Sequence, residues 1–365
     1  MAVEIGGIIV QYLVIYSVYA ILALSFNLEY GFGGIPNFGK VLFVSLGAYA
    51  AGSLVAYIVT GIGASALGVE IASEGTPPYC TGAGKTAMTL AVSQGIVGPS
   101  SLFLLFITSL ALAGIVGAIA GIVASYPALR LRGDFLAITL LALSEVARLI
   151  AYNSEWPACS FNGISGIPGP FAWLTGKSDL AYAGLSVALL VLTFLYVDMA
   201  TNSPWGRALK AMRDDEIAGE VYGYDIPRLR MQALAIGSGL AGMAGAMLAF
   251  YSGNVNANTY KPDLTFMVIA ATMLGGAANN IGALLGAAVI AGLEIFFNPS
   301  SLEALGVSLP QNVSLAMPYL KYVIMGLIII GVLLFRPQGL IPEKPLRVPL
   351  IEKARKRLQE LMEKR

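Results

Sequence analysis

The amino-acid sequence predicts an all-α integral membrane protein: a polytopic helical bundle of about nine to ten transmembrane helices with one broken or re-entrant segment. Only 12% of the 365 residues are charged and 57% are hydrophobic, whereas a soluble domain carries about 25% charged residues. Several apolar runs approach or exceed the ~20 residues that cross a bilayer. These runs are continuously apolar rather than alternating, which argues against a membrane β-barrel. The expected spans are 7–26, 41–60, 102–125, 134–151, 180–200, 232–251, 263–276, 282–297 and 319–335.

The positive charges predict the orientation of these spans. If 336–365 is cytoplasmic, 17 of the 22 Lys and Arg residues fall in segments on the inner side, as the positive-inside rule requires. We therefore expect a multi-pass protein of the cell (plasma or inner) membrane, with a transmembrane domain over 1–340 and a basic amphipathic cytoplasmic tail over 341–365. The sequence contains no His, which excludes His-ligated metals and His acid–base catalysis. We expect no metal site and no enzymatic activity.

The segment 27–40, after the first span, is rich in Gly and polar residues but lies between apolar runs. Irregular backbone at membrane depth is tolerated where it is buried in protein or lines a wet cavity. The segment is therefore an inner loop or a broken helix near a translocation path. If it crosses the membrane, there are ten spans. Gly34 and Asn37 can expose backbone groups to a zwitterionic ligand at the bundle centre, and we take them as pathway candidates.

Two long loops, 61–101 and 152–179, are expected on the external side, and each contains one of the two cysteines, Cys80 and Cys159. An oxidising exterior permits a disulfide between them, and two separate thiols are the alternative. The stretch Gly82–Thr86 resembles the end of a phosphate-binding loop. The required earlier Gly is absent and no strand precedes it, so we expect no nucleotide site there.

Ionisable side chains within the spans are functional candidates, because charge at membrane depth is costly. Glu145 and Arg148 lie three residues apart on one helix face and are either a structural ion pair or part of the pathway. Glu294 is alone in its span, and we interpret it as structural.

The polar island 201–231 is expected to be a cytoplasmic loop that carries a short helix. Asp214 can cap this helix, and Gly223 can end it. Ile217 and Val221 lie on one apolar face, which can rest on the membrane or enter a groove on a partner.

In this loop, Glu216-x-Ala218 followed by Gly223 resembles the ATPase-docking loop of ABC importer permeases, with Gly219 replacing the usual second Ala. The surrounding residues are similar to the branched-chain amino acid (leucine–isoleucine–valine) uptake family, M-type permease subunit. Further matching stretches, in the family's order, are Ser203–Ala208, Leu129–Ile138, Asn162–Pro168, Leu274–Gly276, Phe335–Leu340 and Gly47–Tyr49. The sequence departs from the family before Asn162, after Gly276 and around Asn37.

The resemblance implies the permease subunit of an ATP-driven importer for branched-chain amino acids. Its partners would be two cytoplasmic ATPase subunits, a paralogous second permease in a heterodimer, an external solute-binding protein and membrane lipids, with no nucleic acid. ATP and Mg²⁺ would be used by the ATPases, so this chain would bind no cofactor. The same architecture carrying urea, amides or other amino acids is one alternative, and a stand-alone secondary transporter is another.

Two sets of site residues follow. The expected coupling loop comprises Arg213, Asp214, Asp215, Glu216, Ile217, Ala218, Val221 and Gly223. The expected pathway residues are Gly34, Asn37, Glu145, Arg148, Asn162 and Gly163.

Overall fold

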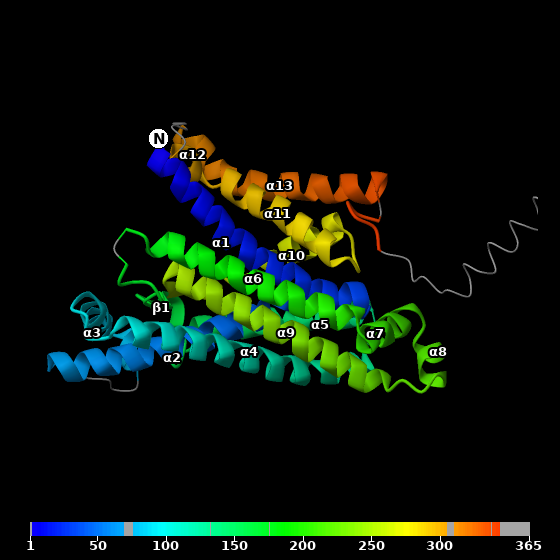
Figure 1. Cartoon of the computed structure of the whole chain (residues 1–365), viewed down its shortest axis with the longest axis horizontal. Coiled ribbons are helices and arrows are strands. Elements are labelled where there is room, and N and C mark those ends of the chain that lie inside the picture. The colour runs from blue at the N-terminus through cyan, green and yellow to red at the C-terminus, as the bar shows by residue number, and fades with distance from the viewer. Residues whose placement is uncertain are drawn as a thin grey trace, which may run out of the picture.

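The computed structural model describes residues 2–68, 76–131, 133–174, 176–304, 310–336 and 338–343. It is an elongated bundle in which most helices run along the long axis (Figure 1). The long helices are α1 (Ala2–Phe26), α2 (Lys40–Leu67), α4 (Pro99–Arg130), α5 (Asp134–Asn153), α6 (Ser178–Asn202), α9 (Ile226–Ser252) and α13 (Gln311–Phe335). The shorter ones are α3 (Gly82–Ser93), α7 (Pro204–Asp214), α8 (Glu216–Val221), α10 (Pro262–Gly275), α11 (Asn280–Phe296) and α12 (Pro299–Ala304).

Helix α9 forms the centre of the bundle and packs most extensively against α4 and α2. Small residues allow this close approach: a Cβ atom on Gly117 would lie 2.5 Å from the carbonyl oxygen of Ser238. A Cβ atom on Gly242 would clash with the carbonyl of Ala113, and one on Gly47 would clash with Gly242. Glycine at these positions therefore brings three helices into backbone contact, as small-residue spacing predicts for membrane bundles.

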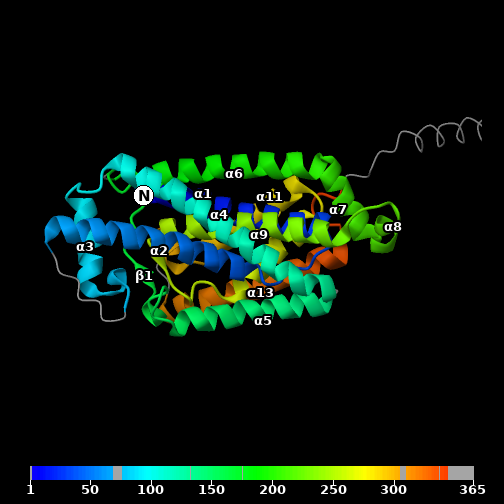
Figure 2. The same ribbon diagram turned by 90° about the horizontal axis from the view of Figure 1, so that it is seen from below.

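The predicted broken segment is present. Helix α1 continues as a π-helix, Asn27–Phe32, and the chain then reverses through 33–39. Helix α2 begins inside the bundle rather than at its end. The amide of Val41 donates to Thr265 Oγ1 of α10 at 3.0 Å, and Gly39 lies against Leu140 of α5. Among the described residues, no candidate membrane span lies between Phe32 and Lys40, so the segment adds no tenth span. Figure 2 shows the bundle from below.

Two of the nine expected spans are short apolar helices, with nearly the bounds predicted for them. Among the described residues, seven helices are long and apolar enough to cross a membrane. The predicted spans 263–276 and 282–297 are α10 and α11, with 14 and 17 residues. At 1.5 Å per residue they reach only about 21 and 26 Å, less than the ~30 Å hydrocarbon core. The sequence prediction of both apolar helices is confirmed, and residues 276–279 form the short connection between them.

The bundle has two distinct ends (Figure 1). One contains α7 and α8, and we call it the α8 end. The other, the disulfide end, contains α3, a 3₁₀ turn at Pro78–Cys80, another at Ser160–Asn162, and a two-residue antiparallel pair of β1 (Ile164–Ser165) with β2 (Asn254–Val255). Helix α13 runs along one side of the bundle, where it contacts α10 and α11. Of the predicted tail 341–365, residues 344–365 lie outside the described residues.

Candidate coupling loop and pathway residues

The expected helix of the coupling loop is α8, and its N-terminal cap is Asp215. The Asp215 carboxylate accepts hydrogen bonds from the amides of Ile217 and Ala218 at 2.9 and 3.1 Å. The prediction that Asp214 caps this helix is wrong, because α7 continues through Asp214 and leaves Asp215 as the extended residue between the two helices. Gly223, at φ +87°, follows the end of α8, as expected.

The apolar face of α8 is turned away from the rest of the chain. Ile217, Val221 and Tyr222 are 73%, 81% and 84% exposed, although apolar side chains of this size are normally covered. Gly219, on the opposite face, is buried, and a Cβ there would lie 3.1 Å from the Ile226 Cδ1 atom. The Ala-to-Gly departure from the docking motif therefore coincides with close packing of α8 on the first turn of α9. A protruding, rigidly seated apolar face is typical of a helix that enters a partner's groove.

Glu216 points inward and anchors α8 to the bundle. It forms an ion pair with Arg230 of α9, and Arg230 also donates to the carbonyl of Ala128 of α4 at 3.1 Å. Motion of α8 would thus be transmitted to two central helices. Arg230 was not among the predicted site residues. Its pairing with Glu216 could have been predicted from its position, because it is a basic residue at the start of the next apolar run, 14 residues after Glu216.

Arg213 links the coupling loop to the break after α1. Its guanidinium donates to the carbonyl of Gly31 at 2.6 Å and pairs with Glu343 at 3.1 Å. Its side chain also packs against Gly34, where an added Cβ would lie 2.9 Å from the Arg213 Cγ atom. Two predicted site residues, Arg213 and Gly34, are thereby brought together.

Glu343 lies between two cations of α7. Besides Arg213, it pairs with Lys210 at 2.8 Å, and the Lys210 ammonium lies 5.1 Å from the centroid of the Phe32 ring. Burial opposes ionisation of Glu343, but hydrogen bonds from Lys210 and Arg213 outweigh it and lower the pKa of this carboxyl. This clamp was not predicted, because it joins residues more than 100 positions apart in the sequence.

The break itself contains a fully buried ion pair. Glu29 of the π-helix lies 2.8 Å from Lys40 at the start of α2, and Asn37 donates to Glu29 at 3.0 Å. Within the described part of the chain, Glu29 Oε1 and Asn37 Oδ1 accept no hydrogen bond. Charges buried at this depth are functional candidates, and π-helical turns often mark functional sites. Asn37 was predicted, whereas Glu29 and Lys40 were missed despite being charged residues in apolar surroundings.

The other predicted pathway residues do not join this cluster. Arg148 and Glu145 pair on α5, with Arg148 Nε donating to Glu145 Oε2 at 2.9 Å, which confirms the expected ion pair. Asn162 is exposed and Gly163, at φ +67°, packs on Asn256, both at the disulfide end. The six residues thus lie in three separate places rather than in one site.

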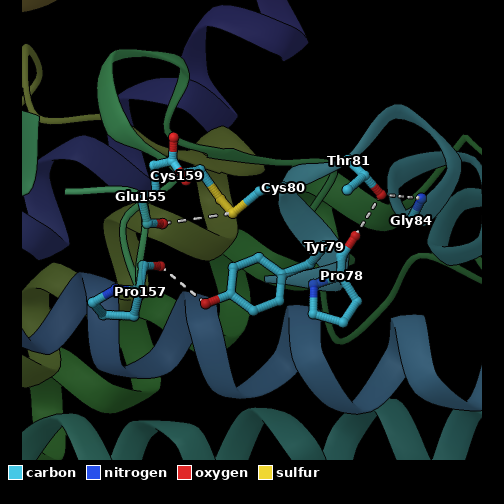
Figure 3. Close-up of a disulfide and its surroundings, with 8 residues drawn as sticks. All are labelled: Pro78, Tyr79, Cys80, Thr81, Gly84, Glu155, Pro157 and Cys159. Atoms are coloured by element: carbon cyan, nitrogen blue, oxygen red, sulfur yellow. Dashed lines mark hydrogen bonds between the residues drawn. A yellow bond between two sulfur atoms is a disulfide. The ribbon is translucent and has the colours of Figure 1, made fainter. Parts of the chain in front are cut away.

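Cys80 and Cys159 form a disulfide with Cα atoms 5.3 Å apart (Figure 3). It joins the two predicted external loops. Beside it, the buried Tyr79 hydroxyl donates to the carbonyl of Pro157 at 3.0 Å, and burial raises the pKa of Tyr79 to about 12. Among the residues that the structure describes, no three His, Cys, Asp or Glu side chains are grouped as metal ligands.

The apolar helices define a multi-pass helical membrane protein. A family model described as "Branched-chain amino acid transport system / permease component" matches residues 8–333. The chain belongs to this family.

Individual relatives agree with the family assignment. The chain is 33% identical over 343 residues to a probable branched-chain amino acid transport permease protein LivM of Methanocaldococcus jannaschii, covering 93% of this chain and 94% of that protein. It is 31% identical to the LivM permease of Salmonella typhimurium, over 65% of this chain and 57% of that one. A probable LivH permease of Methanocaldococcus jannaschii is 25% identical over 90% of both chains. No solved structure matches.

Proposed function

We propose that this chain is the membrane-spanning subunit of an ABC importer for branched-chain amino acids. The observation that carries the proposal is α8, whose apolar side chains Ile217, Val221 and Tyr222 face outward while Glu216 is anchored inward. In this proposal, α8 enters a groove on a separate ATPase subunit. The names of the relatives support the cargo.

The ties behind α8 suggest how ATPase motion reaches the pathway. The ion pair of Glu216 with Arg230 connects α8 to α9. The hydrogen bond from Arg213 to the carbonyl of Gly31 connects α7 to the break after α1. The break holds the buried pair of Glu29 and Lys40. A small displacement of α7 and α8 would therefore move the attached helices as rigid bodies. The contacts between those helices at the centre of the bundle would then repack, as packed interfaces do when they amplify local shifts. The chain would break no covalent bond.

The proposed assembly contains two ATPase subunits, a paralogous second permease and an external solute-binding protein. The α8 end would face the cytoplasm, together with the C-terminus, in agreement with the positive charge of 201–231 and 336–365. The disulfide end would face outward, where an oxidising environment preserves the Cys80–Cys159 bond. ATP and Mg²⁺ would act on the ATPases alone.

The test is ATP-dependent [14C]leucine uptake into proteoliposomes that contain the chain with its ATPases, second permease and binding protein. Val221→Asp should abolish uptake and weaken copurification of the ATPases, because a charge on the docking face would be buried at the interface. Glu220→Gln, an exposed neighbour, is the matched control and should leave both unchanged.

Other outcomes would revise the proposal in defined ways. If leucine is not transported but the binding protein still stimulates ATP hydrolysis, the importer is right and the cargo is wrong, with urea, amides or other amino acids next to be tested. Uptake by this chain without any ATPase would establish a secondary transporter instead.

A further inference from the structure

A cavity of about 250 Å³ lies between α1, α10, α11 and α13, outside every site residue discussed above. Its polar lining carries charges of both signs: Lys321 of α13, Glu294 of α11 and Asp263 at the start of α10. Charged side chains at such positions are costly and are candidates for ligand contact. The location near the first turn of α10 and the last turn of α11 places the cavity in the half of the bundle toward the disulfide end.

The polar groups are connected across the helices. The Lys321 ammonium lies 2.9 Å from Glu294 Oε2, and its side chain is only 12% exposed. Tyr322 donates to Asp263 Oδ2 at 2.6 Å. The Tyr19 hydroxyl lies 3.5 Å from Glu294 Oε2. Acceptors for an ammonium and a donor for a carboxylate therefore lie side by side.

The rest of the lining is largely apolar, and we call this part the aliphatic wall. Ile15, Val18 and Leu22 of α1 line it together with Leu264 and Met267 of α10. A ligand with a zwitterionic head and a branched apolar side chain matches both the polar lining and the aliphatic wall, since pockets combine apolar surface with a few placed polar groups. Urea or a simple amide would leave the aliphatic wall uncovered.

We propose that this cavity is a binding site for the zwitterionic head and aliphatic side chain of a neutral amino acid. The carboxylate of the ligand replaces Glu294 on Lys321, while its ammonium bonds to Glu294 and Asp263. Because a zwitterion supplies both charges at once, no partner of the Lys321–Glu294 pair is left buried and unpaired. A cation that displaced Lys321 from Glu294 would leave the ammonium unpaired, and an anion that displaced Glu294 from Lys321 would leave the carboxylate unpaired, each at high cost. The amino acid class, though not the cavity, rests on the proposed function.

Thr259 gives a direct probe, because it is exposed and also lines the cavity. The sequence has two cysteines, and both are in the disulfide. The Thr259→Cys variant therefore has a single reactive thiol, at position 259. We would measure its labelling by a membrane-impermeant maleimide in vesicles holding the complete importer. L-leucine should slow the labelling, whereas isoamylamine, which lacks the carboxylate, and isocaproate, which lacks the amine, should not.

Lys321 variants separate binding from a purely structural ion pair. Lys321→Met should raise the leucine concentration needed for protection by about tenfold or more, as expected for loss of a charged hydrogen bond. Lys321→Arg should retain most of the protection, and Thr259→Ser is the transport control. Equal labelling with and without leucine would overturn the site, and so would equal protection by the two analogues.

The failure of this site is distinguishable from failure of the importer proposal. [14C]leucine uptake is measured in the same vesicles, in the background of Thr259→Cys. Normal ATP-driven uptake without protection by leucine would refute the proposed binding site and leave the importer proposal standing. Protection by leucine without ATP-driven uptake would support the proposed binding site and refute the importer proposal.

Discussion

At the disulfide end, Cys80 and Cys159 join two loops covalently, whereas at the α8 end the corresponding ties are ion pairs and hydrogen bonds from Arg213, Arg230 and Glu343. A covalent bond holds one arrangement, but ion pairs can exchange partners when a helix shifts. We therefore expect the disulfide end to stay fixed and the α8 end to shift when a partner moves it. The pair of Glu29 and Lys40 lies where the α8 end meets the central helices.

The largest expected effect follows from breaking the buried pair at the junction. Lys40→Met leaves the Glu29 carboxylate without its cation, because both side chains are fully buried, and should destabilise the protein by about 3–5 kcal/mol. Thermal unfolding in detergent would measure this. The double variant Glu29→Gln with Lys40→Met should recover much of the loss, since no charge then remains buried. If the single variant is as stable as the wild type, the junction is not held by this pair.

The next effect is at the disulfide end. Replacing Cys80 and Cys159 together by Ser removes a cross-link that spans 79 residues and should lower stability by about 2–4 kcal/mol. We expect the loss to be confined to the disulfide end, so that the copurifying ATPases stay bound. Proteolysis mapped along the chain would locate the loosened loops. Cleavage that begins around α8 instead would contradict the separation of the two ends.

Much of the architecture of the two ends could be predicted from the sequence, because short local patterns determine it. The apolar runs predicted the helices, the Gly-rich polar segment 27–40 predicted the break, and the cysteines permitted a disulfide. Two features could not be read locally. The pairing of Glu29 with Lys40 depends on a chain reversal, and the Glu343 clamp depends on contact with α7. The position of the α8 cap differed by one residue because α7 extends through Asp214.

A smaller and more specific effect is expected at Arg230. Arg230→Leu removes the anchor between α8 and α9, so ATP hydrolysis should continue while leucine uptake falls by about tenfold, for a loss of some 1.5 kcal/mol in a charged hydrogen bond. The ratio of transported leucine to hydrolysed ATP measures this. Arg228→Leu is the matched control, because Arg228 is 70% exposed and pairs loosely with Asp225 at 3.5 Å, and exposed pairs contribute little. Equal ratios in the two variants would show that the anchor transmits nothing.

The smallest effect concerns the Glu343 clamp and its pH dependence. The pKa of Glu343 is lowered in the folded protein by Lys210 and Arg213, against the effect of burial. The clamp therefore contributes its full stability above the ordinary carboxyl pKa of about 4.3, and that contribution is lost as the pH falls through the lowered value. Glu343→Gln should accordingly be less stable than the wild type at pH 7 and should converge with it at acidic pH. Thermal unfolding of both proteins across this range is the measurement. A stability difference that stays constant with pH would mean that Glu343 acts through packing and not through its charge.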